Sequence, residues 1–404
     1  MYIVSKNIGV SLIVAFFLML EYLPVLKLLP NHFYFGIRIF LTILFFMIAI
    51  KNNFFEFKKY VFVILIAFGI ETLVYFANFI RIFRYEAYII PAMLCFIYAI
   101  IGAYFYKYSS RSLKKYIFYF MTFLTVITSL TTLNGLIDFP LAVRSLGNGG
   151  NTLIFDSLFY YGKNMAGWGM VYGFAFLLPS LVINYKKTKK IIFLIAVIIS
   201  EIMIISSQIM FAILFSILLL YVSIFEIKKY TRIITIVCLL LAVLGIVFSF
   251  REDIFLVLMD IFSNIGNETT TLRLSQIYML LDSGVATGDA DARFELYMMS
   301  FNTFLDNPIF GYDESGEIMY KNIGMHSQIL DLFASVGALF GGCWIGIFFY
   351  LIFDLLKSIL DDRVRFMFVI YIALLFILMV LNPTVFDPEI FLLVFLMPSF
   401  VDVN

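Results

Sequence analysis

Charged residues are scarce in this chain, and cysteine and histidine are scarcer still. Only 14% of the 404 residues are Asp, Glu, Lys or Arg, whereas 63% are hydrophobic. A soluble domain is roughly half apolar and about a quarter charged, so this composition indicates a polytopic membrane protein. The net charge of +1 leaves no basic excess for binding nucleic acid.

The three cysteines lie in apolar runs and predict buried free thiols, with no disulfide framework. They are Cys95, Cys238 and Cys343. The chain has no H-x-x-x-H or C-x-x-C pattern and no cluster of Asp residues, so we expect no metal site. It also lacks the phosphate-binding loop G-x-x-x-x-G-K-[ST]. Energy must therefore come from a gradient, from the substrate itself, or not at all.

Long apolar runs fill most of the sequence. A membrane-spanning helix needs about 20 apolar residues. On this basis we predict an all-α protein with a single integral membrane domain over residues 1–404 and twelve spans. The spans are 8–28, 33–50, 60–80, 87–106, 116–135, 165–184, 191–205, 208–226, 232–250, 328–355, 364–381 and 388–402.

Basic residues predict the orientation of these spans. Most of the 28 basic residues fall in alternate loops, which are therefore cytoplasmic together with both termini. The loop 136–164 and the large late loop 251–327 then face outside. The large loop should contain amphipathic helices: residues 251–263 suit an interfacial helix, and Asp291 can cap a second helix that Asn307-Pro308 ends.

Four polar residues of the outer loops are candidates for binding or catalysis. His326 lies at a predicted helix start, where imidazole suits either a general base or a structural cap. Arginine binds phosphate through a planar fork that keeps its charge. Arg144, Arg273 and Arg293 are therefore candidates for an anionic ligand, with headgroup anchoring or carboxylate pairing as the alternative.

Two carboxylates and several glycines lie within the predicted spans. Glu71 and Glu201 could pair with Arg38, hold a proton or line a proton path. The glycines of the tenth span favour close helix packing. They are Gly337, Gly341, Gly342 and Gly346.

Short motifs in the late loop carry a family resemblance. In order they are Ala292-Arg293-Phe294, Asn307-Pro308-Ile309-Phe310-Gly311-Tyr312, His326-Ser327-Gln328-Ile329-Leu330 and Gly337-Ala338-Leu339-Phe340-Gly341. Together with Arg144 and Asn164-Met165-Ala166, they resemble the O-antigen ligase and polymerase superfamily, most closely a Wzy-type capsular polysaccharide repeat-unit polymerase. Two departures are Ser327, where ligases usually have Asn, and Gln208, where many members have Arg.

The resemblance implies a GT-C-like glycosyltransferase of the bacterial cell membrane that needs no metal or other cofactor. Donor and acceptor would be undecaprenyl-pyrophosphate-linked oligosaccharides, joined at the outer face while polyprenyl pyrophosphate leaves. His326 would activate or orient the acceptor hydroxyl, and Arg144, Arg293 and the weaker candidate Arg273 would bind pyrophosphate. A flippase and a chain-length regulator are implied partners, alongside membrane lipids.

Other functions remain open at this point. A ligase would transfer the finished glycan to a different acceptor by the same chemistry. A flippase for lipid-linked oligosaccharides would use Glu71, Glu201 and the arginines as a pathway, although the chain has no visible internal repeat. A membrane sensor or scaffold should tolerate changes at His326 and Arg293.

Overall fold

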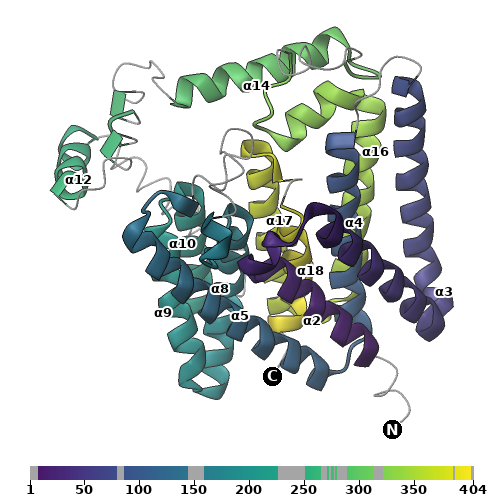
Figure 1. The fold of residues 1–404 in the computed structure, drawn as a ribbon, viewed down its shortest axis with the longest axis horizontal. Helices are drawn as coiled ribbons and strands as arrows, with labels where there is room; N and C mark the ends of the chain where they lie inside the picture. Colours follow the sequence, from purple (N-terminus) through teal and green to yellow (C-terminus); the bar gives the residue numbers. More distant parts are fainter. Residues whose placement is uncertain are drawn as a thin grey trace.

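The computed structural model describes residues 8–79, 86–143, 159–225, 251–264, 271–272, 274–276, 278–279, 289–312, 322–384 and 387–401. All regular secondary structure in these residues is helical, as predicted (Figure 1). The helices are α2 (Ile8–Tyr22), η1 (Pro24–Leu28), α3 (Asn31–Phe79), α4 (Glu86–Tyr108), α5 (Arg111–Asp138), α8 (Trp168–Thr188), α9 (Ile191–Ser206), α10 (Met210–Ile224), α12 (Arg251–Asn264), α14 (Asp289–Asp306), α16 (Gln328–Ser358), α17 (Asp362–Leu381) and α18 (Glu389–Val401).

Five helical segments are long and apolar enough to cross a membrane. They are Asn31–Asn52, Arg111–Asp138, Trp168–Thr188, Gln328–Ser358 and Asp362–Leu381. Shorter apolar helices occupy most of the other predicted spans, and the ninth span, 232–250, lies outside the described residues. The chain is therefore a helical membrane protein, while the full count of twelve spans stays a prediction.

Helices α8 and α18 form the centre of the bundle. Every residue of α18 is buried, and so is α8 from Gly169 to Asn184. A helix that is apolar all round belongs in such a surrounded position. With 13 residues, α18 is only about 20 Å long, which is shorter than the roughly 30 Å hydrocarbon layer. Its first residue, Glu389, consequently lies inside the protein.

The first predicted span, 8–28, is not one helix. Helix α2 ends at Tyr22, and the chain continues through the short 3-10 helix η1 before α3 begins at Asn31. Two prolines explain the break, because Pro24 disfavours helical backbone at Leu23 and Pro30 does the same at Leu29. The predicted first span is therefore a 15-residue helix followed by a short 3-10 helix.

Helix α14 lies across one end of the bundle, above α16 and α17 (Figure 1). The start of α2 and the end of α18 lie at the opposite end. The two helices predicted in the late loop are both present as α12 and α14, and α14 ends at Asp306 before Asn307-Pro308 as expected. Asp291 is not its cap, because the helix already begins at Asp289.

The turn after α14 docks onto a break in α16. Gly337 interrupts α16 with a φ of 71°, which frees the backbone N–H of Ala338 to donate to Pro308 (2.8 Å) and that of Leu339 to donate to Ile309 (3.2 Å). In return, Tyr312 N–H donates to the Ala334 carbonyl (2.8 Å). The two glycine-containing motifs of the sequence are therefore the two halves of one backbone junction.

Two predictions about this helix are wrong. A methyl group at Gly342 or Gly346 would meet no neighbouring atom within 4 Å, so these glycines do not serve close helix packing in the part of the chain described. Cys343 is exposed, whereas Cys95 is buried as expected, and both are free thiols. Cys238 lies outside the described residues.

Replacing Gly337 by alanine should destabilise the protein. The new Cβ would overlap the Ile309 carbonyl, and the left-handed backbone at this residue costs about 1–3 kcal/mol for a side chain. We expect a lower thermal unfolding temperature in detergent, followed by tryptophan fluorescence. Gly342→Ala is the matched control and should unfold like the wild type. Equal unfolding temperatures for all three proteins would contradict the junction.

Candidate functional site

His326 lies directly before α16 and does not cap it. The cap is Ser327, whose hydroxyl accepts a hydrogen bond from Leu330 N–H (3.2 Å). His326 follows Met325, which has a φ of 56° without being glycine. Such backbone costs free energy and persists only where surrounding contacts impose it, so the loop holds His326 in one place.

A buried carboxylate organises this loop. Asp331, one turn into α16, accepts hydrogen bonds from the Ser300 hydroxyl (2.6 Å) and from Ser327 N–H (2.9 Å). The Ser300 hydroxyl in turn accepts one from Gly324 N–H (2.8 Å). Asp331 also interacts electrostatically with His326. Helix α14 is thereby joined to both sides of His326.

The backbone selects the tautomer of His326. Its Nδ1 lies 2.8 Å from the Gly324 carbonyl oxygen. A carbonyl can only accept, so in the neutral ring Nδ1 carries the proton and Nε2 keeps its lone pair. The ring is half-buried, which leaves Nε2 in the state that a general base requires.

We call the hydrogen-bonded residues around His326, namely Ser300, Gly324, Ser327 and Asp331, the α14 layer. Arg293 of α14 belongs to the same layer. Its charge acts on the hydroxyl of Tyr297, and this hydroxyl donates to the Leu381 carbonyl (2.9 Å). Burial raises the pKa of Tyr297, against the opposing effect of the Arg293 charge, and the Asp331 charge acts on the same ring. Arg293 and Asp331 thus share Tyr297 as a neighbour, and Asp331 connects them to His326.

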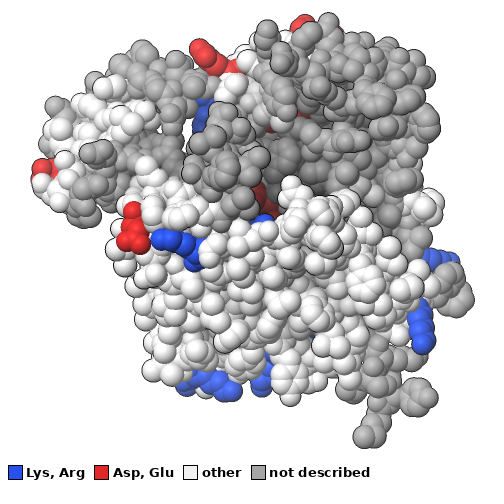
Figure 2. All heavy atoms as spheres, in the orientation of Figure 1, with Lys and Arg blue, Asp and Glu red and all other residues white. Residues whose placement is uncertain are grey.

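The other two predicted arginines, Arg144 and Arg273, lie outside the described residues. Arg293 also acts electrostatically on Tyr172 of α8, which is a central helix of the bundle. The α14 layer therefore faces the N-terminal part of α8. In Figure 2 an acidic and a basic side chain lie next to each other near the centre of this face, below α14.

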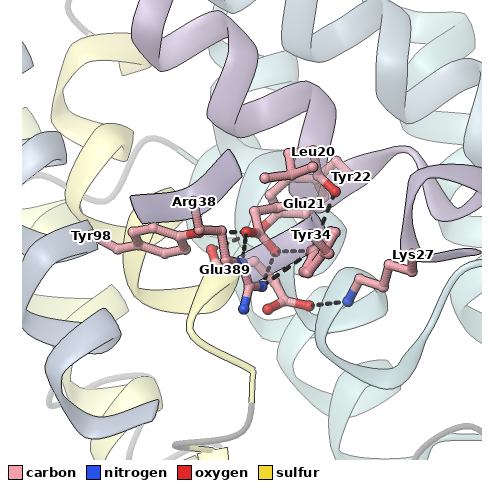
Figure 3. A network of polar contacts seen from close by, with 8 residues as sticks. All are labelled: Leu20, Glu21, Tyr22, Lys27, Tyr34, Arg38, Tyr98 and Glu389. Carbon is pink, nitrogen blue, oxygen red and sulfur yellow. Dashed lines mark hydrogen bonds and ion pairs between the residues drawn. The ribbon is translucent and has the colours of Figure 1, made fainter. Parts of the chain in front are cut away.

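A network of buried charges lies around η1 (Figure 3). Glu21 is fully buried, and its carboxylate accepts two hydrogen bonds from Arg38 (2.8 and 2.7 Å). The hydroxyls of Tyr34 (2.9 Å) and Tyr98 donate to the same carboxylate. Arg38 is thus paired with Glu21. Of the alternatives considered for Glu201, pairing with Arg38 does not occur, because the Glu201 carboxylate accepts a hydrogen bond from Ser216 (2.9 Å). The side chain of Glu71 lies outside the described part.

Lys27 of η1 forms the second ion pair of this network. Its ammonium lies 2.9 Å from Oε1 of Glu389, whose side chain is only 1% exposed. Asp387 stands two residues earlier, and its carboxyl lies against Gly169 in the first turn of α8. Burial and the charge of Glu389 raise the pKa of Asp387 to about 8. These surroundings favour the protonated form of Asp387.

Asn164 ties η1 to the bundle. Its side-chain oxygen accepts from Val25 N–H (3.2 Å), and its side-chain nitrogen donates to Thr131 of α5 (3.1 Å). The Thr131 hydroxyl donates to the Asn164 carbonyl (2.7 Å). Asn164, the first residue of the motif Asn164-Met165-Ala166, therefore positions η1, the element that carries Lys27.

Sequence reasoning missed four titratable residues of this network, namely Glu21, Lys27, Asp387 and Glu389. Apolar residues surround Glu21, Lys27 and Glu389 in the sequence. A carboxylate within a predicted span was the criterion that singled out Glu71 and Glu201, and the same criterion applies to Glu21. Asp387 stood in a predicted loop and gave no signal. Among the described residues, no three His, Cys, Asp or Glu side chains come together as metal ligands.

Comparisons with protein-family models, with curated proteins and with solved structures gave no match to this chain.

The raised pKa of Asp387 predicts a stability that depends on pH. An acid whose pKa is higher in the folded state stabilises the fold below its unfolded value of about 3.9, and this contribution is lost as the pH rises through about 8. The wild type should therefore unfold at a lower temperature at pH 9 than at pH 6. Asp387→Asn is neutral throughout and should flatten this dependence.

Asp362→Asn is the control, because this carboxyl is 90% exposed. It should keep the wild-type slope of unfolding temperature against pH. A slope that is the same in wild type, control and Asp387→Asn would show that Asp387 is ionised in the folded protein.

Proposed function

We propose that this chain is a membrane glycosyltransferase that polymerises lipid-pyrophosphate-linked oligosaccharide repeat units into a capsular or other surface polysaccharide. The observation that carries the proposal is the 2.8 Å contact of His326 Nδ1 with the Gly324 carbonyl, which in the neutral ring leaves the lone pair on Nε2. Arg293 lies in the same polar layer. The motifs around both residues are those that resemble the O-antigen ligase and polymerase superfamily.

The chemistry follows from these two side chains. Nε2 of His326 takes the proton of the acceptor hydroxyl as its oxygen bonds to the anomeric carbon of the donor sugar. The bond from that carbon to the pyrophosphate oxygen breaks, and polyprenyl pyrophosphate leaves with the electron pair. Arg293 stabilises the negative charge of the leaving group, since a guanidinium pairs with phosphate and keeps its charge. The energy resides in the donor bond, so no nucleotide is consumed.

The distribution of charge supports the placement of this reaction at the outer face. Lys and Arg side chains lie along the end of the bundle opposite α14 (Figure 2). Basic residues favour the cytoplasmic side. The α14 layer would then face outside and both termini the cytoplasm, in a bacterial cell membrane. Lipid chains would contact the apolar helices, and a flippase would supply the outer leaflet with substrate.

A second candidate function is transport of the lipid-linked oligosaccharide. The observation that favours it is the buried network of Glu21, Arg38, Lys27 and Glu389 at the interrupted element η1. Intramembrane charges beside broken helices are typical of transporters. A ligase would use the same site as a polymerase with another acceptor.

Replacing His326 by alanine should abolish long polymer while single lipid-linked repeats accumulate. Loss of a general base typically lowers a rate by about 100- to 10,000-fold. The measurement is a gel of lipid-linked glycans from membranes that lack the protein and are complemented with each variant. Arg293→Ala should give the same loss, and Arg293→Lys should restore only part of the ladder because it lacks the bidentate fork.

His32→Ala is the control, because this second histidine is exposed at the start of α3, where its ring packs beside that of Phe33. It should support a full ladder. Normal polymer from membrane-inserted His326→Ala would rule out the assigned role. Accumulation of single repeats on the cytoplasmic leaflet, rather than the outer one, would favour transport over polymerisation as the function.

A further inference from the structure

The proposed reaction uses the bundle-facing side of α14 and leaves a second side of this helix unexplained. Ser300 and Thr303 are buried against the bundle, and Tyr297 donates to the Leu381 carbonyl. Another row of side chains on α14 is apolar and yet exposed, with exposed fractions between 37% and 59%. It consists of Phe294, Met298, Phe301 and Leu305. An exposed apolar row of this kind indicates an interaction surface.

The helical spacing divides α14 into three sides. A helix turns by about 100° per residue, so the four residues of the apolar row form one narrow stripe. The exposed polar residues Glu295, Asn302 and Asp306 lie about a quarter-turn away from this stripe. The bundle-facing residues lie about a third of a turn away in the opposite direction. The apolar stripe is therefore a side of its own, distinct from both the polar side and the bundle-facing side.

The stripe leads onto the exposed side of α16. In the turn after α14, Ile309 and Phe310 are 59% and 61% exposed. The Ile309 carbonyl accepts from Leu339 N–H (3.2 Å), and Leu339 is itself half exposed. Leu339 begins a row of exposed residues that continues along α16 at helical spacing through Gly342, Cys343, Gly346, Phe349, Tyr350 and Phe353. Because α16 is long and apolar enough to cross a membrane, this row contacts lipid, and the exposed apolar surface runs from it across the turn to α14.

Helix lengths place this surface at one boundary of the bilayer. The stretch of α16 from Leu339 to Lys357 is about 27 Å long at 1.5 Å per residue, close to the roughly 30 Å hydrocarbon layer. Lys357, in the last turn, belongs at one membrane surface, so Leu339 lies near the other. Helix α17 gives the same level, because it begins at Asp362 with basic residues nearby and ends at Leu381, whose carbonyl accepts from α14. At this level α14 runs across the ends of the spans rather than along them (Figure 1).

We propose that the apolar stripe of α14, together with Ile309 and Phe310, is immersed in the lipid leaflet opposite Lys357, between the headgroups and the acyl chains. An amphipathic helix takes this position when one side is apolar and another is charged. The polar side of α14 carries acidic residues, so burial of apolar surface, rather than attraction to anionic lipids, holds the helix there. The occupant of the stripe is membrane lipid. This inference goes beyond the proposed function and does not depend on it.

The test is a depth measurement by electron paramagnetic resonance on the full-length protein in vesicles of phosphatidylethanolamine and phosphatidylglycerol. Cys95, Cys238 and Cys343 are replaced by alanine, and a nitroxide is attached to the single thiol of Phe301→Cys or Asn302→Cys. Collision rates with oxygen, which concentrates in lipid, and with a water-soluble nickel chelate give the depth of each label. We expect the label of Phe301→Cys about 5–10 Å within the boundary of headgroups and acyl chains. The neighbouring label of Asn302→Cys, on the polar side, should lie in water.

Phe353→Cys, on the exposed row of α16, is the reference for a label in contact with lipid. If Phe301→Cys does not insert into the membrane, Met298→Cys on the same stripe replaces it and should give the same depth. Equal access of the nickel chelate to the labels of Phe301→Cys and Asn302→Cys would place the stripe in water and overturn the inference. Spin–spin broadening in Phe301→Cys that disappears on dilution with unlabelled protein would identify a second copy of the chain as the occupant, and would overturn it as well.

Discussion

Pairing of buried charge is the constraint on which this bundle depends. A carboxylate in an apolar interior is tolerated only with a cation or several donors, and Glu21 has both in Arg38, Tyr34 and Tyr98. These contacts join α2, α3 and α4, and the Lys27–Glu389 pair adds η1 and α18. Lys27 reaches the core because the chain leaves helix α2 at Tyr22 and turns through η1. A continuous helix would place Lys27 further along the axis of α2. Apolar side chains then pack around this polar frame, which consists of the ion pairs Glu21–Arg38 and Lys27–Glu389.

One short stretch of chain connects this frame to the layer that holds His326. The Leu381 carbonyl accepts from Tyr297, and the Asn382 carbonyl accepts from Gln328 N–H (3.2 Å). Thr384 donates to the Gln328 side chain (2.6 Å), and Asp387 and Glu389 follow directly. The connection between α17 and α18 therefore contacts the α14 layer, the start of α16 and the buried network in succession.

Hydropathy and basic residues predict the helical class and the positions of most apolar helices, because each run is long and its signal is local. The same reasoning locates α14 and its end at Asn307-Pro308, and it selects His326 and Arg293. It fails where the outcome depends on contacts between distant segments. Glu21 looks no different from Glu201 in the sequence, and the contacts with Arg38 and Tyr98 distinguish it from Glu201, which accepts from Ser216. Likewise, the sequence does not distinguish Gly337 from the other glycines of its helix. The structure does, because the backbone of Ile309 lies against Gly337.

The order of these contacts also bears on how binding and chemistry could be linked. Ser327, beside His326, is fixed through Asp331, while Gln328, the next residue, is fixed by Asn382 and Thr384. Any displacement of Glu389 or Asp387 acts on this same connection, since only a few residues separate them from Thr384. Buried hydrogen-bonded contacts are expensive to leave unmade, so these contacts hold the start of α16 and the α17–α18 connection in one arrangement around His326.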